Sequence, residues 1–554
     1  MKKIINISIA AMMLVTVACQ KFLTVVPSDQ QVIETYYTSE EAIDANTASL
    51  YANYVWQDFS INFMWMAGDE LSGDLFYTYA EEGQFYYMTF TSTNTFLNAG
   101  WNGLYRVVSY CNNIINNMPD AARANNIDEA AINKGLAEAR CIRAIAYYFL
   151  TEYWENVPII DNNNVQSNDI VRHKQSSVYE FMRRDLEFAK ANLPERPAQA
   201  GRCSKWTAVG MLAKLHLTMA SHGATDNYET AKNYALEVIN SGLVLYPNLE
   251  SMFYPEGNNS DESLFAIQCT QDGYAYGNPR NVSLSRNSNI NLGNSWGAGK
   301  GATLSLQDAF ESGDRRRKNT FMRQGDSYDR LAGGGYTYAN YSPDGAAVEE
   351  TPNEMLCHVR KYVVGANADC GGKAGATNQD AGNNIYLLRL SDVYLVYVEA
   401  CIGSGSSTSD AKALEAFRAV RERAGLLWSE SSITYEQLIK ERRTEFAFES
   451  INFFDVKRMS YRDPSAAVAY LQNMQRHRQY ISNLTDYTKD DHNVTGAYHG
   501  GSAIADPENE SSIFYINPNI SPLTFTAANL VLPIPDETVA KTPRINEDPV
   551  DYNF

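Results

Sequence analysis

The sequence predicts a mainly α-helical protein, in which helix pairs form a scaffold for long irregular loops and a few short β-strands. Apolar residues recur at helical spacing in two regions, mainly 39–245 and 386–460. Between about 246 and 384 this spacing is largely lost, and glycine, asparagine and serine are frequent, with short β-like runs at 263–269 and 356–364. Loops this long are usually functional or disordered, and their aromatic content argues against disorder.

The first helical region begins at Ser39, which can cap a helix that has Glu40 and Glu41 in its first turn. Helical spacing then recurs over 101–118, 136–154, 178–192, 206–221 and 228–241. Alanines alternate with large residues over 136–154, and small residues let a second helix approach closely. Such pairs resemble tetratricopeptide-type repeats in pattern, but no strict period of about 34 residues fits the chain, so we expect an irregular helical stack.

The second helical region predicts helices over 386–401, 410–424 and 435–459. The first of these is apolar nearly all round, which predicts that it is buried. Gly425 directly follows the second, at a position where a left-handed cap is commonly needed. Residues 460–554 are expected to form an irregular polar tail that ends in Leu532-Pro533-Ile534-Pro535 and a run of turn-forming residues.

The N-terminus has the pattern of an export signal. Lys2 and Lys3 precede an apolar run over 4–17, and Ala18 is followed at once by Cys19. This resembles a bacterial lipoprotein signal, so we expect residues 1–18 to be removed and Cys19 to be acylated. The alternatives are an ordinary signal peptide and a membrane span, although about 14 apolar residues fall short of the ~20 that a spanning helix needs. Residues 19–30 would form a lipid-anchored tether, and 31–554 a single domain.

Composition limits the classes of partner. The 554 residues carry a net charge of −19, and lysines and arginines are scattered, which argues against a nucleic-acid partner. Tyrosines, at 36, outnumber the 22 phenylalanines, which favours surfaces that stack and hydrogen-bond at once. The eight cysteines form no CxxC pair, and those at 141 and 401 are expected to be buried thiols. For Cys357 and Cys370, a loop disulfide and two free thiols both stay open.

Motifs for catalysis or metal binding are weak. Gly293-Asn294-Ser295-Trp296-Gly297 fits G-x-S-x-G, but the alternating strands and helices that a nucleophile elbow requires are missing. Gly299-Lys300-Gly301 lacks the other residues of a phosphate loop. The seven histidines include no HExxH pattern, so no zinc site is expected. Five side chains that could supply oxygen ligands to calcium lie close together in the sequence: Asp369, Asn378, Asp380, Asn383 and Asn384. They lack the spacing of a known calcium loop, so a solvated polar loop is favoured over a structural calcium site. We therefore expect no cofactor.

Three glutamates, Glu441, Glu445 and Glu449, lie four residues apart beside Arg442 and Arg443. One interpretation is a pair of carboxylates for glycoside hydrolysis. The favoured interpretation is structural, because charges at this spacing more often form side-chain pairs along and between helices.

Several segments, in order along nearly the whole chain, resemble the SusD/RagB family of Bacteroidetes outer-membrane lipoproteins. They are Arg140-Cys141-Ile142-Arg143-Ala144 with Tyr153 and Val157-Pro158, Gly201-Arg202 with 208–217, Arg389-Leu390-Ser391-Asp392-Val393 with 397–400, Val420-Arg421-Glu422-Arg423-Ala424-Gly425, Glu441-Arg442-Arg443 with 446–449, Phe454-Asp455-Val456-Lys457-Arg458, and Leu532-Pro533-Ile534-Pro535.

This resemblance implies a mostly helical SusD-like fold and a non-enzymatic lipoprotein of the outer membrane that faces the cell exterior. Such proteins act as a lid on a SusC-like TonB-dependent β-barrel transporter, capture an oligosaccharide and pass it into the barrel. The family motifs are scaffold, so they transfer no ligand-binding residue. A peptide ligand, as in RagB-like import, stays open as an alternative. A surface glycoside hydrolase or peptidase is the alternative from another class.

The residues themselves indicate where a glycan would bind. Sugar rings offer C–H faces to aromatic planes and hydroxyls to polar side chains, so a glycan site needs aromatic groups with polar neighbours. Two segments fit this description, 69–90 and 274–341. The ligand-binding loops as a whole are expected mainly at 69–90 and 260–384. We expect the contacts to come from Asp69, Tyr77, Tyr79, Tyr274, Tyr276, Arg286, Trp296, Tyr336 and Tyr338.

Overall fold

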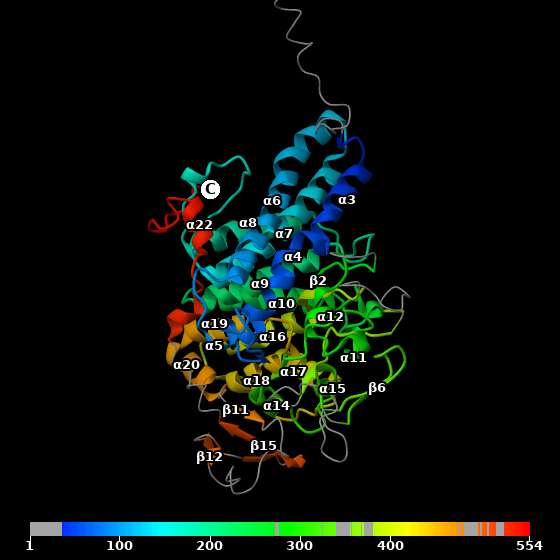
Figure 1. The fold of residues 1–554 in the computed structure, drawn as a ribbon. Coiled ribbons are helices and arrows are strands. Elements are labelled where there is room, and N and C mark those ends of the chain that lie inside the picture. Colours follow the sequence, from blue (N-terminus) through cyan, green and yellow to red (C-terminus); the bar gives the residue numbers. More distant parts are fainter. Residues whose placement is uncertain are drawn as a thin grey trace, which may run out of the picture.

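The computed structural model describes residues 36–554 except 272–275, 324, 340–354, 356, 367, 370–380, 475, 477, 481–496, 499–500, 503, 507–508 and 517–525. The expected signal peptide, the tether with Cys19, and Tyr274, Cys370, Asn378 and Asp380 lie outside the described residues. The described chain is mostly helical with short strand pairs, so the predicted fold class is confirmed (Figure 1). Within the described ranges, no helix combines the length and apolar character that crossing a membrane needs.

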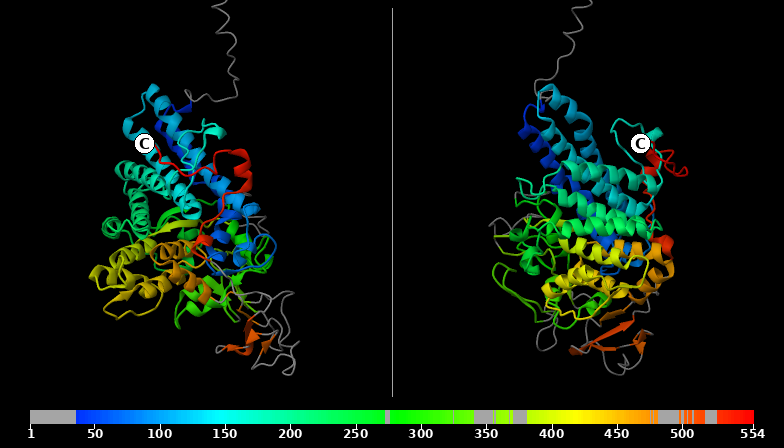
Figure 2. Two further views of the ribbon diagram at one scale, coloured as in Figure 1. Left: turned by 90° about the vertical axis from the view of Figure 1, so that its left-hand side faces the viewer. Right: turned by 180° about the vertical axis from the view of Figure 1, so that it is seen from behind.

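The first helical region forms a stack of packed helices. Its helices are α3 (Glu40–Ala48), α4 (Asn53–Asn62), α6 (Thr95–Ala124), α7 (Glu129–Trp154), α8 (Gln175–Asn192), α9 (Lys205–Ser221) and α10 (Asn227–Ile239). From α6 to α10 each helix packs on the next, and α10 packs on α16 (Leu390–Ile402), as the view from behind shows (Figure 2). Ala137, Ala139, Ala144 and Ala146 are fully buried on α7, as the alanine pattern predicts.

Helix caps explain where two of these helices begin. The Ser39 hydroxyl accepts a hydrogen bond from the Ala42 amide at 3.3 Å, which confirms the predicted cap of α3. Helix α6 begins earlier than the predicted residue 101, because the Asn94 side chain accepts hydrogen bonds from the amides of Phe96 and Leu97 at 3.0 and 3.1 Å.

The second helical region differs from its prediction at two places. It contains α16, α17 (Ala411–Arg423), α18 (Tyr435–Glu445), α19 (Asn452–Arg462) and α20 (Pro464–Asn473). The single helix predicted over 435–459 is wrong: Phe448 and Ser450 adopt left-handed backbone conformations, with φ of 61° and 63°, and separate α18 from α19. The predicted helix from 386 begins as strand β8 (Ile385–Arg389), and only Leu390 starts α16. Helix α16 is buried, and Gly425 has a φ of 84°, both as predicted.

The last part of the chain is more ordered than the predicted irregular tail. It carries α20, the 3-10 turn η6 (Ala527–Leu530), α22 (Asp536–Lys541), a sheet of order β11-β15-β14, and the hairpin β12–β13. These strands are β11 (Arg478–Tyr480), β12 (Ala497–Tyr498), β13 (Gly501–Ser502), β14 (Ile504–Asp506) and β15 (Asn509–Ile516). The Leu532 amide donates to the Tyr153 carbonyl, and Trp154 Nε1 donates to the Pro533 carbonyl, both at 2.9 Å. The tail therefore packs back on α7.

Short elements fill the region between the two helical parts, in green on one side of the stack (Figure 2). The strand pairs are β1 (Leu75–Phe76) with β3 (Gly301–Ala302), β2 (Ser263–Ile267) with β8, β4 (Phe321–Met322) with β7 (His358–Val359), β5 (Ser327–Tyr328) with β6 (Tyr336–Thr337), and, within the second helical part, β9 (Ser407–Thr408) with β10 (Ile433–Thr434). All are antiparallel. The β1–β3 pair joins the two aromatic segments singled out in the sequence.

The remaining short helices lie mostly in the same region. They are η1 (Ser49–Tyr51), η2 (Met66–Glu70), α5 (Gln84–Tyr87), η3 (Ser167–Asp169), α11 (Leu249–Met252), η4 (Pro255–Gly257), α12 (Pro279–Leu284), α13 (Ser288–Asn291), α14 (Leu304–Ala309) and α15 (Arg316–Thr320). One of them, η2, is a single π-helical turn and leads into β1.

A buried ionic network holds α18 in place. Arg389, at the junction of β8 and α16, pairs with Glu445 at 3.0 Å and with both oxygens of Glu449 at 2.7 Å. Arg389 also pairs with Glu262 at 2.6 Å. Burial alone would raise the pKa of Glu445, but Arg423, Arg389 and Arg316 outweigh it and hold that pKa well below its usual range.

The three glutamates at four-residue spacing are therefore structural. Glu441 pairs with Arg316 at 2.5 Å and with Arg421 at 2.7 Å, and all three glutamates are at most 2% exposed. The prediction of side-chain pairs along and between helices is confirmed for Glu441, Glu445 and Glu449.

We predict that Arg389→Met lowers the free energy of unfolding by about 3–5 kcal/mol, because it leaves Glu445 and Glu449 buried beside less positive charge. Arg196→Met is the matched control, since Arg196 is 64% exposed at its side chain in its pair with Asp261, and it should change stability by less than about 1 kcal/mol. Chemical denaturation followed by circular dichroism measures both. Equal losses in the two variants would contradict the structural importance of the network.

Candidate functional site

The loop 293–300 lies between α13 and β3 and forms the centre of the candidate site. Its backbone is held by hydrogen bonds from the Trp296 amide to the Val282 carbonyl at 2.9 Å and from the Gly297 amide to the Ser285 carbonyl at 2.8 Å. The G-x-S-x-G pentapeptide therefore sits in an irregular loop after a short helix, and not on the strand-to-helix turn that a nucleophile elbow needs.

One side of the loop contacts the first aromatic segment. A Cβ atom on Gly299 would lie 3.1 Å from the Tyr77 ring, so the absence of a side chain permits this close approach. Lys300 Nζ lies 3.8 Å from the centroid of the Trp65 ring and 4.6 Å from that of Tyr77, and it donates to the Ser283 carbonyl at 3.0 Å. Burial lowers the pKa of Lys300 to about 8, although nearby glutamates oppose this shift. The loop is thus joined to the Tyr77 segment by contacts with a buried cation.

The other side of the loop contacts the chain around Tyr336 and Tyr338 through His358. The His358 ring is fully buried, with Nδ1 2.5 Å from the Tyr338 hydroxyl and Nε2 2.8 Å from the Ala298 carbonyl. The guanidinium of Arg286 lies 4.8 Å from the centroid of the Tyr338 ring and donates to the Ala339 carbonyl at 2.8 Å. Tyr336 lies beside Tyr338, with ring centroids 6.5 Å apart. The loop therefore connects segments that are far apart in the sequence.

Four of the expected contact residues around this loop reach solvent. Tyr79 is 70% exposed and Trp296 is 50% exposed, while Tyr77 and Tyr336 are partly exposed. The Tyr77 and Tyr79 ring centroids are 6.4 Å apart. Trp296 precedes Gly299 by three residues, so their Cα atoms lie within about 11 Å of each other. We call Tyr77, Tyr79, Trp296 and Tyr336 the aromatic surface.

Three other expected contact residues lie beneath the surface. Arg286 is 2% exposed and Tyr338 is fully buried. Asp69 is also 2% exposed, and its carboxylate accepts hydrogen bonds from the Ser450 amide at 2.9 Å and the Ser450 hydroxyl at 2.8 Å. Burial raises the pKa of Asp69 to about 7, against the opposing effects of Arg280 and Ser450. In this structure these side chains support the loops rather than face solvent.

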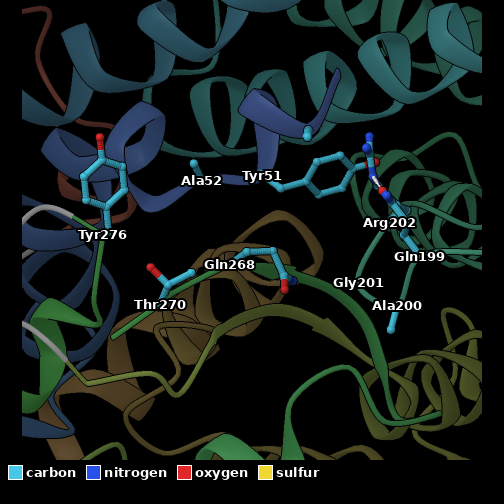
Figure 3. A pocket seen from close by; sticks show the side chains of 10 residues that line it. Tyr51, Ala52, Gln199, Ala200, Gly201, Arg202, Gln268, Thr270 and Tyr276 are labelled. Carbon is cyan, nitrogen blue, oxygen red and sulfur yellow. Dashed lines mark hydrogen bonds between the residues drawn. The ribbon is translucent and has the colours of Figure 1, made fainter. Parts of the chain in front are cut away.

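Tyr276 lies at a separate pocket of about 260 Å³. The pocket is lined by Ala48, Tyr51, Ala52, Gln199, Ala200, Gly201, Arg202, Gln268, Thr270 and Tyr276. Figure 3 shows Tyr276 and Thr270 at one end, and Arg202 and Gln199 at the other. Arg202 pairs with Glu138 at 2.8 Å, so its charge is neutralised within the protein. This pocket shares no lining residue with the aromatic surface.

The oxygen-bearing loop shows no calcium geometry in the part of the chain that is described. Asp369 forms an ion pair with Arg330, and the amide groups of Asn383 and Asn384 donate to protein carbonyl and side-chain oxygens. No cluster of three or more His, Cys, Asp or Glu that could hold a metal occurs among the described residues.

The described cysteines for which the sequence makes a prediction differ in burial. Cys357 is buried, and Gln307 donates a hydrogen bond to its sulfur at 3.3 Å. Cys141 is buried as predicted, whereas Cys401 is partly exposed.

Sequence reasoning missed three side chains that build the site: Trp65, Lys300 and His358. Lys300 was considered only as part of a phosphate loop, yet a lysine between two glycines was a usable signal of close backbone approach. His358 and Trp65 gave no signal, because their partners are a backbone carbonyl, a tyrosine and a cation far away in the sequence.

Together these features define a helical protein whose irregular loops carry an exposed aromatic surface. Residues 256–550 match a family model described as "SusD family", and residues 21–217 match a second described as "Starch-binding associating with outer membrane". The chain belongs to the SusD family, which confirms the resemblance found in the sequence.

The chain is similar to known proteins over a quarter to nearly all of its length. A SusD-like protein of Bacteroides ovatus is 34% identical over 563 residues, covering 99% of this chain and 98% of that protein. The starch-binding protein SusD of Bacteroides thetaiotaomicron is 26% identical over 141 residues, about a quarter of each chain. A crystal structure with a xylogluco-oligosaccharide is 30% identical, with a TM-score of 0.79 over 93% of this chain and 99% of that chain. A laminarin-binding SusD-like protein shares the fold at 21% identity and a TM-score of 0.66, over 93% and 100% of the two chains.

We predict that Gly297→Ala lowers the free energy of unfolding by about 1–3 kcal/mol, because its Cβ would lie 2.3 Å from the Leu284 backbone carbonyl. Gly299→Ala is the matched control in the same loop. Its new Cβ would meet only the Tyr77 ring, at 3.1 Å, so a loss under about 1 kcal/mol is expected. Denaturant unfolding compares the two, and a larger loss for Gly299→Ala would contradict this description of how the loop is seated.

Proposed function

We propose that this protein is a glycan-binding lipoprotein of the outer cell surface that captures oligosaccharides on the aromatic surface. It then delivers them to a SusC-like TonB-dependent transporter, for which it acts as the lid. The observation that carries this proposal is the exposure of Tyr77, Tyr79, Trp296 and Tyr336 around one loop. Aromatic planes that project from irregular loops suit the C–H faces of sugar rings.

The comparisons support the glycan as ligand class. The relative crystallised with a xylogluco-oligosaccharide aligns over nearly the whole chain, and the Bacteroides ovatus relative is similarly complete. The proposal is a binding and not a catalytic role. It is supported by Glu441, Glu445 and Glu449, the carboxylates considered for hydrolysis, because they are buried in ion pairs and the pKa of Glu445 is lowered, opposite to what a general acid requires.

The buried residues of the expected site have a supporting role in this proposal. Arg286 and Tyr338 hold the strand that carries Tyr336, and Asp69 holds the turn at Ser450. In this proposal, the pocket beside Tyr276 is a second surface that part of a longer oligosaccharide can contact.

We predict that Trp296→Ala lowers the affinity for the cognate oligosaccharide at least tenfold, which is about 1.4 kcal/mol, because it removes the largest exposed ring of the aromatic surface. Tyr336→Ala should have a smaller effect in the same direction. A glycan array on protein that starts after Cys19 first identifies the ligand, with xylogluco-oligosaccharide and laminarin fragments included, and isothermal titration calorimetry then measures each variant.

Tyr110→Ala is the matched control, since Tyr110 is 39% exposed on α6 and does not belong to the aromatic surface. The affinity of this variant for the oligosaccharide should equal that of the wild type. Tyr276→Ala shows whether the ligand reaches the second pocket. Unchanged affinity in both Trp296→Ala and Tyr336→Ala would remove the aromatic surface from the site. Binding of peptides but no glycan would favour the import of peptides, and turnover of a bound glycan would show an enzyme.

We further predict that Cys19→Ala spares glycan binding in solution but abolishes retention in the outer membrane. Each acyl CH₂ in a bilayer contributes about 0.8 kcal/mol, and more than one chain is needed for stable anchoring. Fractionation of cells that express the two forms, with calorimetry on the purified proteins, measures both effects. If the variant stays in the outer-membrane fraction, the transporter and not the lipid retains the protein.

A further inference from the structure

We infer that His358 is a positioning residue for the ligand: it ties the Trp296 loop to the Tyr336 strand, so that the glycan meets aromatic side chains already in place. This inference rests on the proposed function and deepens it, because it assigns a role to a buried residue that touches no ligand.

His358 connects three segments that lie apart in the sequence. It lies on β7, whose pairing with β4 sets His358 opposite Met322. From there the ring reaches the Ala298 carbonyl in the 293–300 loop and the Tyr338 hydroxyl just after β6, at 2.8 and 2.5 Å. The ring is fully buried, so water does not compete for either contact.

The partners determine the tautomer of the ring. A carbonyl oxygen only accepts, so Nε2 of His358 carries the proton and donates to Ala298. In the neutral imidazole Nδ1 is then an acceptor, and the Tyr338 hydroxyl donates to it. Burial, with a smaller effect from Arg286, lowers the pKa of His358 to about 3, which keeps this neutral form. Each ring nitrogen thus has one defined partner.

The two hydrogen bonds end close to exposed rings. Ala298 is two residues from Trp296 and adjacent to Gly299, which packs on Tyr77. Tyr338 is two residues from Tyr336, and their rings are 6.5 Å apart. Fixing Ala298 relative to Tyr338 therefore fixes Trp296 relative to Tyr336. A binding surface that is already ordered avoids the free-energy cost of ordering loops and side chains on binding.

The test compares His358→Leu with His358→Gln. The amide nitrogen of glutamine can donate to the Ala298 carbonyl, whereas leucine fills space but donates nothing. We expect His358→Leu to weaken affinity for the oligosaccharide found on the array at least fivefold, and His358→Gln to stay within about twofold of the wild type. Tyr338→Phe removes the other hydrogen bond alone and should fall between them. Equal losses in the leucine and glutamine variants, or no loss in either, would overturn the inference.

A second measurement does not need a ligand. Of the seven tryptophans, five are at most 6% exposed: Trp56, Trp65, Trp101, Trp154 and Trp206. Acrylamide quenching of fluorescence therefore reports mainly Trp296, with a smaller part from the partly exposed Trp428, and Trp296→Phe measures that background. We expect His358→Leu to increase the Trp296 quenching constant and His358→Gln to leave it unchanged.

The two measurements separate the failure of this inference from failure of the proposed function. If the wild type binds no glycan, the proposed function fails, and quenching still tests whether His358 holds the loop. Unchanged quenching in His358→Leu would overturn the positioning role even where glycan binding is found. Thermal unfolding of each variant identifies any affinity loss that merely follows a loss of stability.

Discussion

The ionic network around α18 is the constraint on which the rest of the structure depends. Moving ions from water into a protein interior costs several kcal/mol each, so buried charges must meet partners with good geometry. Here Arg389 pairs with Glu262 and with the neighbouring Glu445 and Glu449, so three separate parts of the chain meet at one guanidinium. A second set joins Arg442 to Asp392 at 2.8 Å and to Asp455 at 2.9 Å. These pairs fix α16, α18 and α19 relative to one another and to β2.

The same network reaches the candidate site along two routes. Lys361 pairs with Glu449 at 2.9 Å and lies three residues after His358, so this ion pair anchors the chain just beyond β7, the strand that carries His358. Along the second route, Arg280 donates to the Phe448 carbonyl at 2.6 Å, and Asp69 holds Ser450. Asp69 belongs to η2, which leads into the segment of Tyr77 and Tyr79. Both sides of the aromatic surface are therefore fixed to the end of one helix.

The sequence predicts the helical scaffold well, because apolar spacing, alanine positions and caps are local signals. Its failures have a common cause in long-range contacts. Residues 446–451 continue the helical spacing of α18, yet a left-handed turn is held there by the hydrogen bond that Arg280 donates and by the one that Asp69 accepts from Ser450. The strand β8 is too apolar to distinguish from a buried helix, and only its pairing with β2 decides. The packing of Leu532 on Tyr153 joins residues almost 400 apart.

The candidate site shows the same division between local and distant information. Aromatic residues in irregular segments indicate two candidate loops, and Trp296 and Tyr79 are exposed there. Composition could not separate an exposed ring from the ring beneath it, so Tyr338 and Tyr336, two residues apart, were treated alike although only Tyr336 reaches solvent. The Tyr338 hydroxyl group is held beneath the surface by His358, whose own role becomes visible only when Ala298 is placed against it.

The layer beneath the aromatic surface explains how loops without regular secondary structure can hold such rings still. Lys300 lies against Trp65 and Tyr77, and Arg286 lies against Tyr338, and each cation also donates to a backbone carbonyl. The positive charges of Lys300 and Arg286 thus hold aromatic rings in place. The exposed layer above these two cations consists of the aromatic surface. In the proposed function this division is useful, because the buried cations hold the rings in place and leave the ring faces in the exposed layer to contact the ligand.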